Sequence, residues 1–444
     1  MKKILLVFAL FNILTFSVCA KSVKNDFESV IQDSGVDLES IAISIKNADN
    51  GKKIYSLNEK ILMNPASVQK VLTTPVAVET LGNDYEFSTE LYKRDENSYL
   101  IKLGADPYLT TSELKNLVKQ MDKETSKIYL DDFVLDSKTW GEGWQWDDDM
   151  NILMPRFGSY NLDKNLIKLT VVPTKAGQFA TIINPSKYPL VFFNNVVTSD
   201  KTNIDIKRDS AISPNTLMLT GSVSRPTVLY IPTVNLKRYF DVQLTKSLEE
   251  RSIYLKDSFV STRKATTDEL VQKNTHSIDL AVNDILKNSN NMVSETIFKL
   301  AGGKYCNLVS GTDSSGIKMF NDYCSKNNLD NSRIRISDAS GVSKNNLVSA
   351  DFITEFLKLN KDNEVLAKLP KPGEGTLTHR LVPIKNNLRA KTGTLKDISS
   401  IAGYLTTKTG KNLVFCIMIN DMKLSGSDKK MLEDFILREA YLRL

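Results

Sequence analysis

The chain has 444 residues, of which 41% are hydrophobic and 25% are charged, with 20 glycines and 13 prolines. This composition is typical of globular proteins and excludes a collagen-like, fibrous or largely disordered chain. The length favours about two or three domains. The formal net charge of +6, from 58 basic and 52 acidic residues, is too slight to indicate a nucleic-acid partner.

Histidine and cysteine usage excludes several kinds of site. His276 and His379 are the only histidines in the sequence, which excludes a His-rich metal site and argues against a Ser-His-Asp site. The four cysteines contain no Cys-x-x-Cys pair, so a zinc ribbon and a thioredoxin motif are excluded too. We expect no metal and no cofactor. The sequence leaves open whether Cys306 and Cys324 form a disulfide.

The first twenty residues are typical of a secretory signal peptide. Lys2 and Lys3 precede an apolar stretch over residues 4–18, and small residues surround a cleavage site after Ala20. The stretch is shorter than the roughly 20 apolar residues that span a membrane, although an uncleaved anchor is the alternative. We therefore expect cleavage after Ala20, a periplasmic location and at most peripheral contact with a membrane. A homo-oligomer stays possible.

The N-terminal part of the chain predicts a hairpin followed by a helix. Residues 41–46 and 53–57 are expected strands, joined by a turn over 47–51 that is rich in Asn, Asp and Gly. A helix is expected to start near Ser67, because apolar residues follow it at helical spacing. Pro75 should kink or shorten this helix.

The middle of the chain has a different character. A charged helical segment is expected over residues 112–122. Runs of β-branched and aromatic residues then predict strands at 166–172, 180–183, 190–197 and 227–231. This region is therefore expected to be β-rich.

The last third predicts helices and then a sheet. Helices are expected over 275–288 and 293–300, with a loop between them at 289–291. Three antiparallel strands are expected at 389–393, 399–406 and 413–420. An amphipathic helix over 429–442 closes the chain.

Ser67 and Lys70 form a Ser-x-x-Lys motif. At helical spacing both side chains lie on one face. A neutral lysine amine can take the proton of the serine hydroxyl when burial or a neighbouring cation lowers the pKa of the lysine. The motif is weak alone, because it recurs four times, beginning at Ser112, Ser261, Ser315 and Ser427. Context favours Ser67, which follows a hairpin and opens an apolar helix.

Two further short motifs follow in the chain. Ser289 and Asn291 form a Ser-x-Asn motif in the expected loop, and Lys391, Thr392 and Gly393 form a Lys-Thr-Gly motif on an expected strand. A second Lys-Thr-Gly begins at Lys408, where turn chemistry explains it. The order Ser-x-x-Lys, Ser-x-Asn, Lys-Thr-Gly is that of penicillin-recognising acyl-serine enzymes.

With these motifs in place, the chain resembles the class C low-molecular-mass penicillin-binding proteins, which are D-alanyl-D-alanine carboxypeptidases and endopeptidases. The matching stretches are residues 65–73, 103–107, 136–140, 143–148, 338–343, 373–377 with Arg380, and 389–395. They span nearly the whole chain after residue 20. Two positions depart from the family pattern: Ala339 stands where a glycine is usual, and Lys344 where an arginine is usual. Lysine keeps the charge but loses bidentate recognition of a carboxylate.

The resemblance implies an α/β (α+β) fold of the serine β-lactamase/transpeptidase type. Its antiparallel five-stranded sheet is flanked by helices, and β-rich domains are inserted between the first two motifs. The expected catalytic domain takes residues 21–88 and 262–444. Inserted domain II takes 89–163 and 246–261, and inserted domain III takes 164–245.

The resemblance also implies the roles of the motif residues around the reacting bond. Ser67 is the nucleophile and Lys70 its base, while the charge of Lys391 helps to keep Lys70 neutral. Ser289 relays a proton to the leaving amine, and Asn291 holds Lys70 and the substrate amide.

Further implied roles concern binding. Thr392, Gly393 and Thr394 bind the substrate or penicillin carboxylate beside Lys391, and the N–H groups of Ser67 and Thr394 form the oxyanion hole. Asp136 matches an aspartate that binds the free amino group of a diaminopimelate side chain, and a solvated turn residue is the alternative. Ser340 and Gly341 are expected to shape the wall of the cleft.

The implied partners are peptidoglycan peptides as substrates and β-lactam antibiotics as acylating inhibitors. Two other functions stay as alternatives. A β-lactamase would share the acylation but release the acyl group quickly. A non-catalytic peptidoglycan-binding or cell-division scaffold would keep the fold without turnover, and it would have no need for the full set of motif residues.

Overall fold

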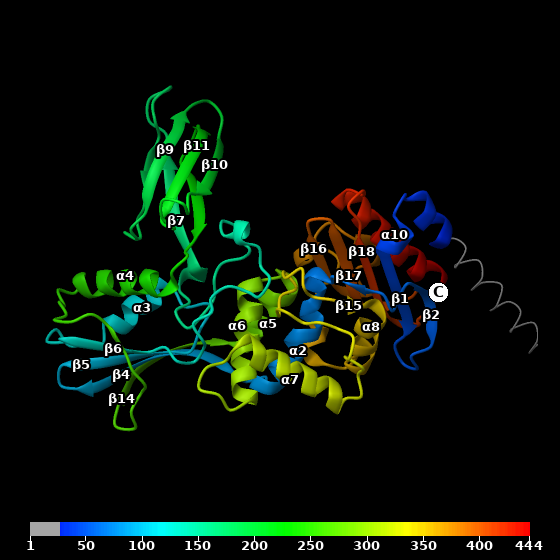
Figure 1. Cartoon of the computed structure of the whole chain (residues 1–444), viewed down its shortest axis with the longest axis horizontal. Helices are drawn as coiled ribbons and strands as arrows, with labels where there is room; N and C mark the ends of the chain where they lie inside the picture. The colour runs from blue at the N-terminus through cyan, green and yellow to red at the C-terminus, as the bar shows by residue number, and fades with distance from the viewer. Residues whose placement is uncertain (1–26) are drawn as a thin grey trace, which may run out of the picture. The chain divides into compact units, whose positions relative to one another are not determined.

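The computed structural model describes residues 27–444 (Figure 1). The expected signal peptide therefore lies outside the described residues. The chain divides into two compact units. Among the described residues, unit 1 consists of 27–79, 281–290 and 317–444, and unit 2 consists of 80–280 and 291–316. The unit boundaries fall at other residues than the expected domain borders, which stay a prediction.

Unit 1 is built on a five-stranded antiparallel sheet in the order β16-β17-β18-β1-β2. Its strands are β1 (Ile41–Asn47), β2 (Lys53–Leu57), β16 (Leu388–Leu395), β17 (Ile398–Thr406) and β18 (Asn412–Asn420). The expected hairpin, the three C-terminal strands and the mixed fold class with this sheet are confirmed. β1 lies beside β18, so the first and last strands of the chain are neighbours.

Helices cover both faces of this sheet, which explains the nearly continuous burial of β1, β17 and β18. Ile43 and Ile45 pack into a core with the apolar side chains of α10 (Gly426–Arg443). Ser44, which points the other way, makes a 2.8 Å hydrogen bond to Thr354 of α8 (Ala350–Leu359). Figure 1 shows α8 and α10 on either side of the sheet.

The helix that follows the hairpin differs from its prediction. A short 3-10 turn (Ala66–Gln69) leads into α2 (Lys70–Leu81), which continues through Pro75. The expected shortening at Pro75 is wrong. Residues 70–78 are all buried, so packing offsets the hydrogen bond that proline cannot donate.

Unit 2 contains a second five-stranded sheet, in the order β13-β6-β5-β4-β14. Its strands are β4 (Glu86–Asp95), β5 (Ser98–Leu103), β6 (Lys127–Asp131), β13 (Val260–Ser261) and β14 (Glu269–Ser277). Because β14 reaches Ser277, the helix expected from residue 275 begins later, as α5 (Ile278–Lys287). β14 alternates exposed and half-buried residues, so it has no strong apolar signal.

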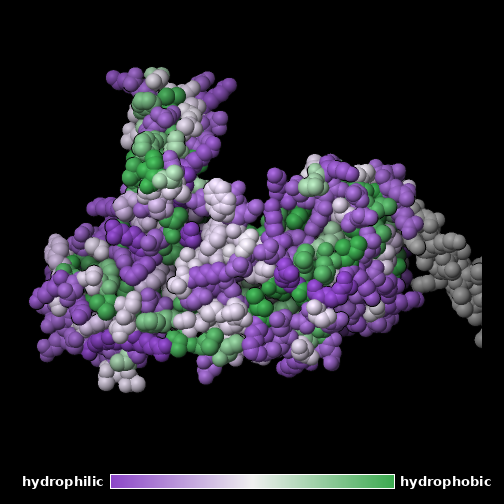
Figure 2. Space-filling model, in the orientation of Figure 1, coloured by the Kyte–Doolittle hydropathy of each residue, from purple (hydrophilic) through white to green (hydrophobic). Residues whose placement is uncertain are grey.

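Two three-stranded sheets, β12-β7-β8 and β10-β11-β9, account for the expected β-rich region. Their strands are β7 (Leu166–Val172), β8 (Thr181–Ile183), β9 (Val191–Thr198), β10 (Asn203–Arg208), β11 (Thr216–Val223) and β12 (Thr227–Pro232). Phe193 and Met218 lie opposite each other on an outer face and are 47% and 41% exposed. Apolar surface is visible on this part of the chain in Figure 2.

Two short strands and several α-helices of 4 to 15 residues complete the described fold. They are β3 (Leu62–Met63), β15 (Val348–Ser349), α3 (Thr111–Val118), α4 (Leu236–Glu249), α6 (Asn291–Tyr305), α7 (Asp313–Lys326) and α9 (Glu364–Ala367). Cys306, Cys324 and Cys416 are free thiols, so the disulfide that the sequence left open is not formed. Among residues 27–444, no helix is both long enough and apolar enough to span a membrane.

Candidate active site

Ser67 and Lys70 meet at the start of α2. The ammonium nitrogen Nζ of Lys70 lies 2.9 Å from Oγ of Ser67 and 2.6 Å from the carbonyl oxygen of Ser340. Lys70 is fully buried. The serine hydroxyl thus has a proton acceptor within hydrogen-bond distance whenever the lysine is neutral.

The loop over residues 338–343 positions the Ser340 carbonyl. The buried carboxylate of Asp338 accepts hydrogen bonds from the backbone N–H groups of Gly341 and Ser343, both at 2.7 Å, and from the Ser340 hydroxyl at 3.1 Å. Gly341 has φ +81°, and a Cβ atom there would overlap the carbonyl oxygen of Ala66, the residue before Ser67. The loop therefore packs directly against the turn that carries Ser67.

Ser340 has a contact that sequence reasoning missed. It was expected only to shape the cleft wall, yet its backbone oxygen holds Lys70. Every residue type has a backbone carbonyl, so the identity of residue 340 does not reveal this contact. The neighbouring glycine is the signal that could have shown it, because a left-handed glycine beside a motif indicates close backbone approach.

Lys391 lies on β16 and is completely buried, with its ammonium nitrogen 2.8 Å from the carbonyl oxygen of Thr392. Burial, and after it the positive charge of Lys70, lowers the pKa of Lys391 well below its usual value. Lys391 was expected to be the cation that keeps Lys70 neutral. Coulomb repulsion is mutual, so each lysine disfavours charge on the other, and the expected effect of Lys391 on Lys70 stays a prediction.

The rest of β16, the strand that carries the Lys-Thr-Gly motif, lies beside the turn that carries Ser67. Ser400 of β17 pairs with Gly393 in the sheet and donates a 2.6 Å hydrogen bond to the carbonyl oxygen of Pro65. Thr392 donates to the hydroxyl of Thr376 at 2.7 Å. Thr394 is exposed, which leaves its side chain available to a ligand.

Ser289 lies in the loop between α5 and α6, with φ +60°. Asp284 fixes both neighbours of Ser289: its two carboxylate oxygens accept hydrogen bonds from the side chains of Asn288 and Asn290 at 2.9 and 2.8 Å. Sequence reasoning missed Asp284. An aspartate one turn before a loop is common, and only the fold shows what it holds.

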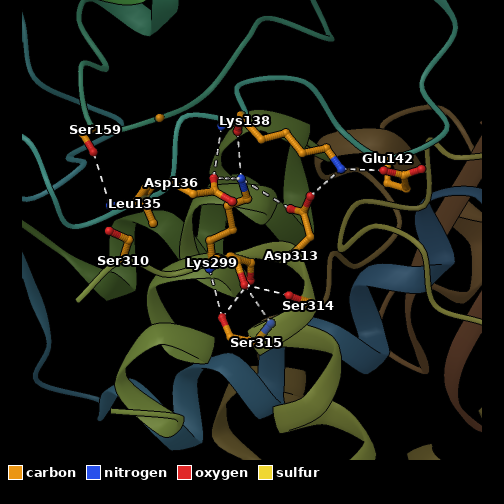
Figure 3. A network of polar contacts seen from close by, with 12 residues as sticks. Leu135, Asp136, Lys138, Glu142, Ser159, Lys299, Ser310, Asp313, Ser314 and Ser315 are labelled. Carbon is orange, nitrogen blue, oxygen red and sulfur yellow. Dashed lines mark hydrogen bonds and ion pairs between the residues drawn. The ribbon is translucent and has the colours of Figure 1, made fainter. Parts of the chain in front are cut away.

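Asn291 and Asp136 belong to unit 2. Asn291 is the first residue of α6, and its side-chain amide donates a 2.8 Å hydrogen bond to the carbonyl oxygen of Leu153. Asp136 accepts from the ammonium group of Lys299 at 2.7 Å (Figure 3). Asp136 is therefore part of an internal ion pair and not a solvated turn residue.

The second Lys-Thr-Gly lies in a turn between β17 and β18, as expected. Lys408 there donates its backbone N–H to the carbonyl oxygen of Tyr441 at 2.8 Å. Lys344, at the position where the family pattern has arginine, is exposed.

Known proteins resemble the chain over nearly its full length. D-alanyl-D-alanine carboxypeptidase DacB of Haemophilus influenzae is 23% identical over 413 residues, which cover 87% of this chain and 86% of that protein. D-alanyl-D-alanine carboxypeptidase of Actinomadura sp. is 23% identical over 437 residues, covering 89% and 80%. The crystal structure of penicillin binding protein 4 (dacB) from Haemophilus influenzae has the same fold, with a TM-score of 0.80 at 22% identity and coverage of 90% and 96%.

The sequence model of one peptidase family matches residues 23–438. That range holds all three motifs and every strand of the five-stranded sheet around Ser67. The chain therefore belongs to the D-Ala-D-Ala carboxypeptidase 3 (S13) family of serine peptidases.

Proposed function

We propose that the chain is a serine-type D-Ala-D-Ala carboxypeptidase, a DD-endopeptidase or both, which cleaves peptidoglycan stem peptides and cross-links through an acyl-serine intermediate. The observation that carries this proposal is the 2.9 Å contact between Nζ of Lys70 and Oγ of Ser67, beside a second buried lysine. Membership of the S13 family supports the same reaction.

In the proposed reaction, Oγ of Ser67 attacks the carbonyl carbon of the D-Ala–D-Ala amide while neutral Lys70 takes the hydroxyl proton. The C–N bond then breaks, and the leaving amine receives a proton through Ser289. The acyl group stays on Ser67 as an ester, which water hydrolyses to free the serine. The backbone N–H groups of Ser67 and Thr394 stabilise the oxyanion, where losing one donor costs about 3–4 kcal/mol in other enzymes.

Substrate binding is assigned to residues around the reacting bond. Asn291 holds the substrate amide, and Lys391, Thr392 and Thr394 bind the terminal carboxylate. The backbone of Gly393 lies on the same strand. We further propose that Asp136 binds a cationic side chain of the stem peptide, because a carboxylate forms strong charge-assisted hydrogen bonds with an ammonium group.

Penicillins are proposed to acylate Ser67 and to leave it slowly. The Haemophilus influenzae protein has also been crystallised in complex with a novel β-lactam, and that structure has a TM-score of 0.74 to this chain at 22% identity. The proposed location is the periplasm, which rests on the signal-peptide pattern of residues 1–20. Contact with a membrane is proposed to be peripheral at most.

The test is to incubate the chain without residues 1–20 with a penicillin and to record its intact mass. We expect one stable adduct on the unchanged chain and none on Ser67→Ala. Ser427→Ala is the matched control, because Ser427 opens another Ser-x-x-Lys match, on α10, and should keep the adduct. The unchanged chain, before it meets penicillin, should also release D-alanine from a stem peptide, and Ser67→Ala should not.

Two other results would replace the proposal. Fast penicillin hydrolysis without a lasting adduct would identify a β-lactamase. Neither adduct nor turnover, from a chain that is folded by circular dichroism, would identify a non-catalytic scaffold.

A further inference from the structure

Lys299 is a buried lysine that the proposed reaction does not use. It lies on α6, and its side chain is 1% exposed. Its ammonium nitrogen lies 2.7 Å from Oδ1 of Asp136, 2.8 Å from the carbonyl oxygen of Lys138 and 3.5 Å from Oδ1 of Asp313 (Figure 3). An ammonium group this deeply buried is stable only while such partners satisfy it.

The backbone of Asp136 is held by the segment that follows α6. The N–H of Asp136 donates to the carbonyl oxygen of Gly311 at 3.1 Å, and the N–H of Gly311 donates to the carbonyl oxygen of Val134 at 2.9 Å. One residue earlier, the Ser310 hydroxyl donates to the carbonyl oxygen of Phe133 at 2.6 Å. α6 and the segment after it thus fix both the main chain and the side chain of Asp136.

The two carboxylate oxygens of Asp136 differ. Oδ1 accepts from Lys299 at 2.7 Å and from the backbone N–H of Lys138 at 3.3 Å. Among residues 27–444, no donor lies within hydrogen-bond distance of Oδ2, and the Asp136 side chain is 28% exposed. Oδ2 is therefore the atom that an external donor can reach.

Charge counting shows that the cluster can still accept a cation. Three carboxylates, those of Asp136, Asp313 and Glu142, face the two ammonium groups of Lys138 and Lys299. The cluster therefore has one negative charge in excess. A single ammonium group from a substrate would balance it.

We propose that Lys299 is a positioning residue that sets the preference of this chain for stem peptides with a cationic side chain. By holding Oδ1 of Asp136, Lys299 leaves Oδ2 oriented to receive the substrate ammonium. The proposal deepens the proposed function and rests on it. Lys299 acts through Asp136 and does not itself touch the substrate.

Lys138 provides a matched comparison within the same cluster. Its side chain is 41% exposed and pairs with Glu142 at 2.5 Å and with Asp313 at 2.9 Å. It makes no side-chain contact with Asp136 among the described residues. Lys138→Met and Lys299→Met thus remove the same charge from the cluster, but only Lys299→Met removes the group that orients Asp136.

The experiment compares two synthetic stem peptides ending in D-Ala-D-Ala, which differ only at the third residue: one has lysine and the other norleucine. We measure kcat and KM for D-alanine release with the unchanged chain, Lys299→Met, Lys299→Arg and Lys138→Met. The rate of acylation by penicillin is measured for every variant, and thermal unfolding reports whether each variant is folded.

We expect Lys299→Met to raise KM for the lysine peptide by about tenfold or more, since misplacing a binding group by about an ångström has effects of that size. Its kcat, its kinetics on the norleucine peptide and its penicillin acylation should change by less than about twofold, because Ser67 and Lys70 are untouched. Lys299→Arg should restore most of the preference, and Lys138→Met should keep it.

Three results would overturn the proposal. The first is an unchanged preference for the lysine peptide in folded Lys299→Met. The second is an equal loss of this preference in Lys138→Met, which would show that charge alone matters. The third is an equal loss of activity on both peptides, which would show a general structural role. If Lys299→Met does not fold, Asp313→Asn takes its place, and we expect this variant to lose preference for the lysine peptide as well. An unchanged preference in folded Asp313→Asn would contradict the proposal. Failure of the proposed function is distinct, because the unchanged chain would then form no penicillin adduct and cleave neither peptide.

Discussion

At the scale of single residues, the chemistry of the site depends on two buried lysines. Lys70 contacts the Ser67 hydroxyl, and Lys391 is near enough for the two positive charges to repel. Each ammonium group loses hydration on burial, which already disfavours its charge. Their repulsion adds to this cost, so the pair releases a proton more readily than an isolated surface lysine. A serine nucleophile can thereby work without histidine.

The pH dependence of acylation tests this coupling. Acylation needs a lysine that has lost its proton, so its rate should rise with pH through a midpoint. Burial and the charge of Lys70 lower the pKa of Lys391, so the coupled pair should release its first proton at a lower pH than an exposed lysine does. Lys391→Met removes one of the two repelling charges. The midpoint should then move to higher pH, and the rate near neutral pH should fall by about tenfold or more.

Stopped-flow measurement of penicillin acylation across pH checks this expectation. Lys396→Met is the control, because Lys396 is exposed in the turn after β16 and should leave the midpoint in place. An unshifted midpoint in folded Lys391→Met would mean that the two lysines titrate independently.

At the scale of elements, the strands of the five-stranded sheet in unit 1 could be predicted, whereas its short strands β3 and β15 and several strands of unit 2 could not. β1, β17 and β18 are rich in apolar residues and buried along nearly their whole length, because helices cover both of their faces. β4 and β14 contain Glu, Lys, Asp and Asn, so their residue pattern does not predict strands. They form strands because they pair with each other. Tertiary pairing outweighs local preference in such strands.

The contact between the 338–343 loop and the turn before Ser67 gives a prediction at this scale. Gly341→Ala forces a side chain into the left-handed region and against the Ala66 carbonyl, so the turn that carries Ser67 must move. We expect penicillin acylation to slow by about tenfold or more.

Gly410→Ala separates the two causes. Gly410 has φ +84° with no atom within 4 Å of an added Cβ, so this variant has only the backbone strain. Its acylation rate should match that of the unchanged chain, while its melting temperature falls slightly. Equal acylation by Gly341→Ala and the unchanged chain would show that the loop does not hold the turn.

At the scale of the whole molecule, each unit has its own apolar core. The core of unit 2 includes Leu169, and that of unit 1 includes Ile417. Ser67, Lys70 and Lys391 all belong to unit 1, whereas Asn291 and Asp136 belong to unit 2. The motif residues could be picked from the sequence by their order. The pairing of Asp136 with Lys299, 163 positions later, could not, because no local pattern links residues so far apart.

Because the two units have separate cores, a substitution in the core of unit 2 should lower stability without changing the reacting groups of unit 1. Leu169→Ala should lower the free energy of unfolding by about 2–5 kcal/mol, because it leaves a cavity in the core of unit 2. Penicillin acylation at 25 °C should be unchanged, since the reacting groups lie in unit 1. Calorimetry and intact mass check both parts, and slower acylation by a fully folded variant would contradict the expectation.

The pairing of β1 with β18 places Ile41 beside Ile419, so the central sheet joins strands from distant parts of the sequence. During synthesis the segment bearing Ser67 emerges well before β18, the strand that must flank β1. Until β16 and β18 are made, β1 has only β2 as a neighbour and the site lacks Lys391, so the nucleophile has no complete site in which to react. A chain that stops before β16 should therefore be inert toward penicillin, because its catalytic centre forms only after β16, β17 and β18 have been made.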